Sequence, residues 1–150
     1  MKRLFVFLIC VLLIGNTFAL PVAAAENQQI IVSQTVQDLG NGNYFVETIY
    51  VPDVQLYSNS KTGTKTAEYI ASGTTIYTIS VTGTFTYDGT TSDATSASCA
   101  IATHVSGASI LSRNAYTSGA SAIASGSVSY IGVTLQKTVT LTCDKNGKLS

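Results

Sequence analysis

Apolar and hydroxyl side chains alternate with a period of two in two segments of this chain, and that period restricts both segments to β-strands. Successive side chains of a strand point to opposite faces, so one face of each segment is expected in a core and the other in water. The even-numbered positions are mostly threonine. The apolar odd-numbered positions are Tyr77, Ile79, Val81, Phe85 and Tyr87 in the first segment and Val133, Leu135, Val139, Leu141 and Cys143 in the second.

Two residues interrupt these apolar faces. Gly83 stands where the first segment needs a large side chain, and glycine inside a strand marks a bulge or a close approach of another part of the chain. Lys137 stands in the apolar series of the second segment. A lysine there suits a bulge, a strand end or an edge strand that turns a charge inward to discourage pairing with another chain.

The rest of the chain adds shorter strand patterns separated by glycine-containing turns. An N-terminal hairpin is predicted from Ile31 to Val36 and Tyr44 to Val51, because the Asn41-Gly42 step tolerates the positive φ that tight hairpin turns require. A polar connection is predicted from Ser58 to Thr66, leading into a short strand. The strands predicted beside the two segments above are Ala67 to Ala71, Ala94 to His104, Ser109 to Tyr116 and Ala120 to Tyr130.

This spacing predicts an all-β fold. About seven to nine short strands favour an antiparallel β-sandwich, immunoglobulin-like or jelly-roll-like, with a small barrel as the alternative. Residues 26–150 are expected to form one sandwich domain, in which residues 26–66 supply the hairpin and polar connection and residues 67–150 the core. Serine and threonine make up 37 of these 125 residues, which argues against helices.

The first 25 residues have the pattern of a secretory signal peptide. Lys2 and Arg3 precede an apolar run from Leu4 to Ile14, and Ala23-Ala24-Ala25 supplies the small residues of a cleavage site. The run is shorter than the roughly 20 residues of a spanning helix. The chain is therefore predicted to be secreted, without a membrane span after cleavage. Residues 26–150 carry six Lys+Arg and eight Asp+Glu, a charge that does not favour nucleic acid as a partner.

Cleavage would remove Cys10 and leave Cys99 and Cys143. An even number of cysteines in an exported chain favours a disulfide between them. The alternative is a pair of buried thiols.

Side chains that carry catalysis are scarce. His104 is the only histidine, and a hydrolytic triad would have to combine it with a serine such as Ser106 and with Asp88 or Asp93. Asp88, Asp93 and Asp144 could also contribute to a calcium site, although ordinary turns explain their sequences as well. We predict no catalytic residues, no metal and no cofactor, and keep a small hydrolase based on His104 as the alternative.

Tyrosines and threonine faces are the main binding candidates. Tyrosine offers a rigid amphipathic ring for stacking on sugars or for contact with proteins. The even-numbered strand faces would present short hydroxyls without charge, flat enough for a glycan, a protein or a second copy of the chain to dock. The predicted binding residues are Thr82, Thr84, Tyr44, Tyr116 and Tyr130.

The segments Gly83-Thr84-Phe85-Thr86-Tyr87-Asp88-Gly89 and Leu141-Thr142-Cys143-Asp144-Lys145-Asn146-Gly147 resemble small exported proteins of clostridial and related Gram-positive bacteria, over roughly Tyr69 to Ser150. The group has no known activity, so the resemblance implies a secreted β-rich domain and no site residues. Export and the scarcity of catalytic side chains together predict a secreted, non-enzymatic protein that binds a cell-envelope, glycan or protein partner through its surface.

Overall fold

A computed structural model describes residues 29–53 and 59–150, so the predicted signal peptide lies outside the described residues. Within these ranges the chain forms antiparallel strands and no helix, and therefore no helix that could cross a membrane. The all-β prediction is confirmed. The eight strands are β1 (Gln29–Gly40), β2 (Asn43–Pro52), β3 (Ser60–Ala71), β4 (Thr74–Tyr87), β5 (Ser92–Thr103), β6 (Ser109–Ser118), β7 (Ser121–Tyr130) and β8 (Val133–Thr142).

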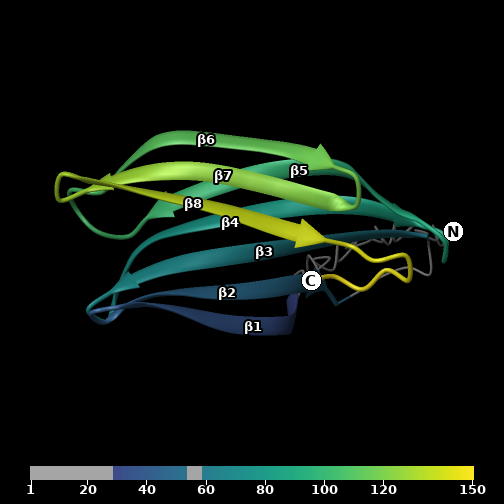
Figure 1. Cartoon of the computed structure of the whole chain (residues 1–150), viewed down its shortest axis with the longest axis horizontal. Helices are drawn as coiled ribbons and strands as arrows, with labels where there is room; N and C mark the ends of the chain where they lie inside the picture. Colours follow the sequence, from purple (N-terminus) through teal and green to yellow (C-terminus); the bar gives the residue numbers. More distant parts are fainter. Residues whose placement is uncertain (1–28, 54–58) are drawn as a thin grey trace, which may run out of the picture.

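The strands form a sandwich of two sheets in which spatial order follows chain order. One sheet has five strands in the order β1-β2-β3-β4-β5, and the other has three in the order β6-β7-β8 (Figure 1). The chain changes sheet between β5 and β6. The immunoglobulin and jelly-roll folds mix strands of different sheets through Greek-key connections, whereas here each sheet is a simple meander.

The three-stranded sheet covers only part of the larger one. β6 packs over β5, β7 over β4 and β5, and β8 over β3 and β4, which leaves β1 and β2 at an open side (Figure 1). The core lies between the covered parts. Val81 and Phe85 of β4 and Leu141 of β8 are 0% exposed, and Val139 is 1% exposed. The odd-numbered faces predicted from the alternation therefore meet in one core, except for Val133 at the start of β8, which is 57% exposed.

Glycines allow the sheets to approach closely. A Cβ atom on Gly83 would lie 2.6 Å from Cβ of Ala122, on the opposing sheet, and 2.8 Å from the Phe85 ring, so Gly83 marks a close approach, one of the two alternatives predicted for it. Gly63 of β3 plays the same part near the C-terminus, where a Cβ would collide with Leu149. An isolated antiparallel β-bridge, formed by the backbones of Cys143 and Leu149, brings the final residues back onto the sandwich.

The prediction of a polar connection from Ser58 to Thr66 is wrong, because β3 begins at Ser60. Its inward positions are Lys61, Gly63 and Lys65 instead of large apolar residues, so the alternation that identifies the other strands is hidden. Gly63 is needed for close packing, and Lys65 has an acidic partner, Glu47 of β2. The N-terminal hairpin is confirmed, with positive φ at Gly40, Asn41 and Gly42.

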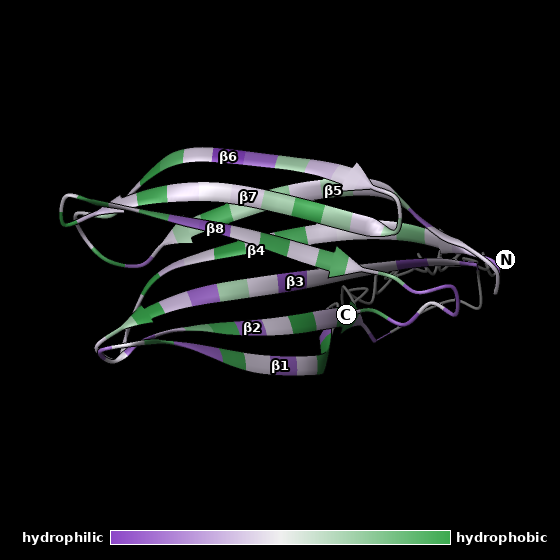
Figure 2. Cartoon of the chain, viewed as in Figure 1, coloured by the Kyte–Doolittle hydropathy of each residue, from purple (hydrophilic) through white to green (hydrophobic). Residues whose placement is uncertain are grey.

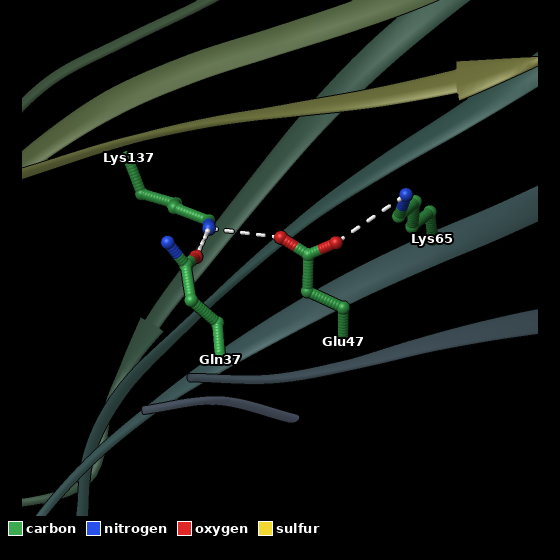
Figure 3. Close-up of polar contacts among 4 residues, drawn as sticks. All are labelled: Gln37, Glu47, Lys65 and Lys137. Atoms are coloured by element: carbon green, nitrogen blue, oxygen red, sulfur yellow. Dashed lines mark hydrogen bonds and ion pairs between the residues drawn. The ribbon is translucent and has the colours of Figure 1, made fainter. Parts of the chain in front are cut away.

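A polar cluster spans the open side, where β8 faces β2 across the sandwich (Figure 3). The Lys137 Nζ atom lies 2.8 Å from Oε1 of Glu47, donates to Oε1 of Gln37 at 3.2 Å, and stands 4.2 Å from the centroid of the Phe45 ring. Nζ of Lys65 lies 3.3 Å from the other Glu47 oxygen. Lys137 is thus an inward charge on an edge strand, one of the alternatives predicted for it.

Glu47 is held in its charged form by these contacts. Partial burial acts to raise the pKa of its carboxyl group, but the hydrogen bond and charge of Lys137, together with Lys65, hold that pKa below its ordinary value of 4.5. The side chains of Glu47 and Lys137 retain only 22% and 13% exposure, so water screens this pair less than an ordinary surface pair.

Candidate binding face

The outward side of the five-stranded sheet carries a continuous array of small hydroxyl side chains. Because residues 77 to 85 of β4 turn their odd-numbered side chains into the core, the even-numbered ones point outward, and cross-strand pairing extends this face to β3 and β5. We call this array the threonine face. It consists of Thr62, Thr64, Thr66, Thr78, Ser80, Thr82, Thr84, Thr86, Ser96 and Ser98.

Hydrogen bonds order the centre of the threonine face. Oγ1 of Thr64 lies 2.8 Å from Oγ1 of Thr82, and the neighbouring pair, Thr62 and Thr84, is 3.1 Å apart. A hydroxyl has one proton to donate and two lone pairs, so each such pair uses one donor and leaves the other for an incoming ligand. Among these strands the outward carboxylates are Glu68, beside Thr78, and Asp93, beside Thr86, one near each end of the array.

The structure brings together only part of the predicted binding set. Thr82 and Thr84 are half-buried neighbours on the threonine face. Tyr50, which pairs with Thr64 in the same cross-strand row as Thr82, borders them. Tyr44 lies on the same outward side of β2, but six residues from Tyr50, about 20 Å along an extended strand.

Tyr44 belongs to a different feature, a shallow hollow of about 330 Å³ beside the β1–β2 turn. The walls are mainly apolar. An Asp38 oxygen in the hollow accepts the Gly40 N–H at 2.8 Å, which stabilises the turn. The residues that line it are Val36, Asp38, Gly40, Asn41, Gly42 and Tyr44.

The other two predicted tyrosines, Tyr116 and Tyr130, belong to the three-stranded sheet. The prediction that they share one site with Thr82 and Thr84 is therefore corrected. Tyr116 is 49% exposed and lies opposite Ile123, on the sheet's outward side. Tyr130 packs against the core instead. Thr134, Thr138 and Thr140 line that second outward side, so the two predicted threonine faces lie on opposite sides of the sandwich.

The alternative hydrolytic triad is not assembled. Nε2 of His104 lies 2.8 Å from Oγ1 of Thr78, on the exposed outward side of the sheet. Asp93 pairs with Thr86, eight residues beyond Thr78 on β4 and hence about 26 Å away. Asp88 follows the end of that strand, farther still. A triad requires its three groups within hydrogen-bond reach, which these carboxylates do not meet.

Two of the three candidate calcium carboxylates, Asp88 and Asp144, serve turns, whereas Asp93 lies on β5 and lines a hollow together with Asp88. An Asp88 oxygen accepts the backbone N–H groups of Thr90 and Thr91, and Asp144 accepts those of Asn146 and Lys148. The hydrogen bonds from Thr91 and Thr90 hold the pKa of Asp88 below its ordinary value, and those from Lys148 and Asn146 do the same for Asp144. Within residues 29–53 and 59–150 no three metal-binding side chains are grouped.

Cys99 and Cys143 are both free thiols in the structure, so the predicted disulfide is not formed. The sheet order gives the reason. Cys99 lies on β5, where the backbone of Asn114 on β6 contacts it, whereas Cys143 follows β8, which packs over β3 and β4. Burial raises the pKa of the Cys99 thiol above its ordinary value. The alternative of two thiols is the one observed.

Sequence reasoning considered Tyr50 among the tyrosines that could bind a ligand but did not place it in the row of Thr82, and it missed the pairing of Glu47 with Lys137. A signal for Tyr50 existed in its even position on the predicted strand from Tyr44 to Val51. Comparison of the chain with models of protein families, with curated proteins and with solved structures finds no match.

Proposed function

We propose that this chain is a secreted, non-enzymatic binding protein that holds a neutral glycan of the cell envelope on its threonine face. The observation that carries the proposal is the ordered hydroxyl array around Thr82 and Thr84, bordered by Tyr50. Neutral sugars are recognised by hydroxyl hydrogen bonds and by stacking on aromatic rings, and this face offers both.

Charge supports a neutral ligand. The outward positions of β3 to β5 carry Glu68 and Asp93 near the ends of the array and hydroxyl groups with Ala100 between them, whereas Lys61 and Lys65 face inward. A polyanion would meet two carboxylates and no compensating cation on this face. A neutral chain lying across the array meets donors and acceptors at each step.

A protein partner is the competing occupant, and the hydrolase based on His104 is the competing activity. The flat face, which lacks charge between Glu68 and Asp93, is also compatible with a protein surface, but Tyr50 is the one aromatic anchor that borders Thr82 and Thr84 among the described residues. His104 contacts Thr78, and the candidate carboxylates lie at the far end of β4. The geometry therefore favours binding over hydrolysis.

The test uses a glycan array and a pull-down screen with residues 26–150, together with two matched double variants. Thr82→Lys/Thr84→Lys places charges on the threonine face, and Thr138→Lys/Thr140→Lys places the same charges on the opposite sheet. We expect the first variant to lose binding to a neutral glycan and the second to retain it. Equal binding by both variants would exclude the threonine face, and a ligand found only among proteins would contradict the glycan.

Secretion is tested separately. The predicted signal peptide requires that the protein recovered from the culture medium begin at Glu26. N-terminal sequencing measures this directly. A chain retained in the cell with Met1 intact would contradict the export on which the proposed cell-envelope partner depends.

A further inference from the structure

β1 is an edge strand that has no strand on its outer side among the described residues. All twelve residues of β1 are exposed, and on its one paired side it contacts β2. The strand contains one charged residue, Asp38, and neither lysine nor proline. Figure 2 shows hydrophobic and hydrophilic bands alternating along β1. An edge strand that is long, exposed and apolar offers its free backbone groups to another strand. Its exposed large apolar side chains are Ile30 (45%), Ile31 (56%), Val32 (49%), Val36 (66%) and Leu39 (48%).

The other edges of the two sheets are protected. β8 turns Lys137 inward, which is a common way to disfavour pairing with another chain. β6 has a bulge between Ile110 and Ser112 and carries Arg113, and β5 packs beneath it. β1 has irregular pairing between Ile31 and Ser33 and between Asp38 and Gly40, but the stretch from Ser33 to Asp38 between them pairs regularly with β2 and can accept a second neighbour.

We propose that two copies of this chain pair through β1, antiparallel and centred on Val36, and form one sheet that continues across both chains. In that register Val36 faces Val36 of the second copy at the two-fold axis. Gln34 faces Asp38, so the carboxylate meets an amide donor and not another carboxylate, and Thr35 faces Gln37. Directly opposed side chains of an antiparallel pair lie on the same face, which this arrangement satisfies for residues 34–38.

The hollow beside the β1–β2 turn supports a second copy as the occupant. In the register centred on Val36, position 31 of one chain falls opposite position 41 of the other. Ile31 points outward, as its pairing with Tyr50 shows, and the hollow lined by Val36 and Tyr44 opens on that same outward side. The exposed Ile31 of each chain is thus placed to enter the mainly apolar hollow of its partner.

The apolar area that β1 exposes is of the order that a reversible dimer buries. The five exposed apolar side chains leave an area on the order of a few hundred Å² on each chain, and a symmetric pair doubles it toward the roughly 1,000 Å² that a specific interface needs. A two-fold axis perpendicular to the sheet keeps the outward faces of both chains on one side. The pairing therefore also aligns the two threonine faces, although it does not depend on what those faces bind.

Sedimentation equilibrium of residues 26–150 over a wide range of concentrations tests the proposal. The variant Val36→Lys places two like charges directly opposite each other at the axis, and Val133→Lys is the matched control, since Val133 is 57% exposed on the other sheet. We expect the wild type and Val133→Lys to dimerise with the same dissociation constant, and Val36→Lys to weaken the dimer at least about tenfold. Thermal unfolding checks that each variant is folded.

Hydrogen exchange of the wild type at low and high concentration locates the contact. Backbone amides of β1 that face away from β2 should become protected as the dimer forms. A wild type that stays monomeric at every concentration would overturn the proposal. This holds even if β1 is then found to pair with a strand of a different protein. Protection confined to β6, or equal weakening by both lysine variants, would overturn it as well.

Discussion

Lys137 connects the two sheets at the open side, and its removal should measurably destabilise the protein. The change we consider is Lys137→Met, which keeps most of the aliphatic stem and removes the charge. It deletes the 2.8 Å ion pair with Glu47, the hydrogen bond to Gln37 and the cation–π contact with Phe45. Glu47 would retain Lys65 at 3.3 Å.

The magnitude follows from these contacts. A hydrogen bond to a charged group contributes about 1.5–3 kcal/mol, and a partly exposed cation–π contact about 0.5–1 kcal/mol. The remaining exposure of both charged side chains and the residual partner Lys65 argue for the lower part of the combined range. We therefore expect the free energy of unfolding to fall by about 2 kcal/mol, and Tm to fall by about 6–10 °C for a domain of this size.

A double-mutant cycle isolates the pair. Urea unfolding of wild type, Lys137→Met, Glu47→Gln and the double variant should give a coupling energy of about 1–2 kcal/mol at pH 7. The parallel cycle with Lys65→Met is the control and should give less than about 1 kcal/mol, because that pair is longer and lies within one sheet. A Lys137 coupling below about 0.3 kcal/mol would refute the reasoning.

The same cycle predicts the pH dependence. The folded-state pKa of Glu47 is lower than its ordinary value of 4.5, so the pair contributes its stability above that value. The contribution is lost as the pH falls through the lower, folded-state pKa. The coupling energy should therefore vanish in acid, and a coupling that persists there would show that the Glu47 charge is not its source.

Two substitutions and one thiol assay test the core. Gly83→Val should cost at least about 2 kcal/mol in urea unfolding, because even a Cβ there would lie 2.6 Å from Ala122; a tolerated valine would contradict the close approach. Tyr77→Phe should leave stability unchanged or raise it by up to about 1 kcal/mol, since the buried hydroxyl, whose pKa burial raises to about 12, has no hydrogen-bond partner among the described residues; a loss above about 1 kcal/mol would reveal one. Unfolding without reductant should release two reactive thiols, Cys99 and Cys143, in a colorimetric assay, and none would be released if they are bridged.

The sequence by itself determined which residues are strands and which strand faces are buried wherever large apolar residues alternate with threonine. Residues 77–87 and 135–143 follow this rule, and the hairpin at Asn41 follows from its turn residues. Side-chain period and turn conformation are both local properties of the backbone. The same local reasoning indicated a bulge or a close approach at Gly83 and a candidate inward charge at Lys137. Thr82 and Thr84 were likewise predictable as neighbours on an outward face.

Only the tertiary structure decided what those faces meet. β3 was hidden because its inward glycine and lysine become understandable only when Leu149 and Glu47, distant in sequence, lie against them. The exposure of β1 depends on the number of strands in the opposing sheet, and period-2 alternation is the same for a covered strand and an uncovered one. The sheet order also put Cys99 and Cys143 on differently packed strands and Tyr116 on the side opposite Thr82. Long-range pairing sets these relations, and no local pattern encodes it.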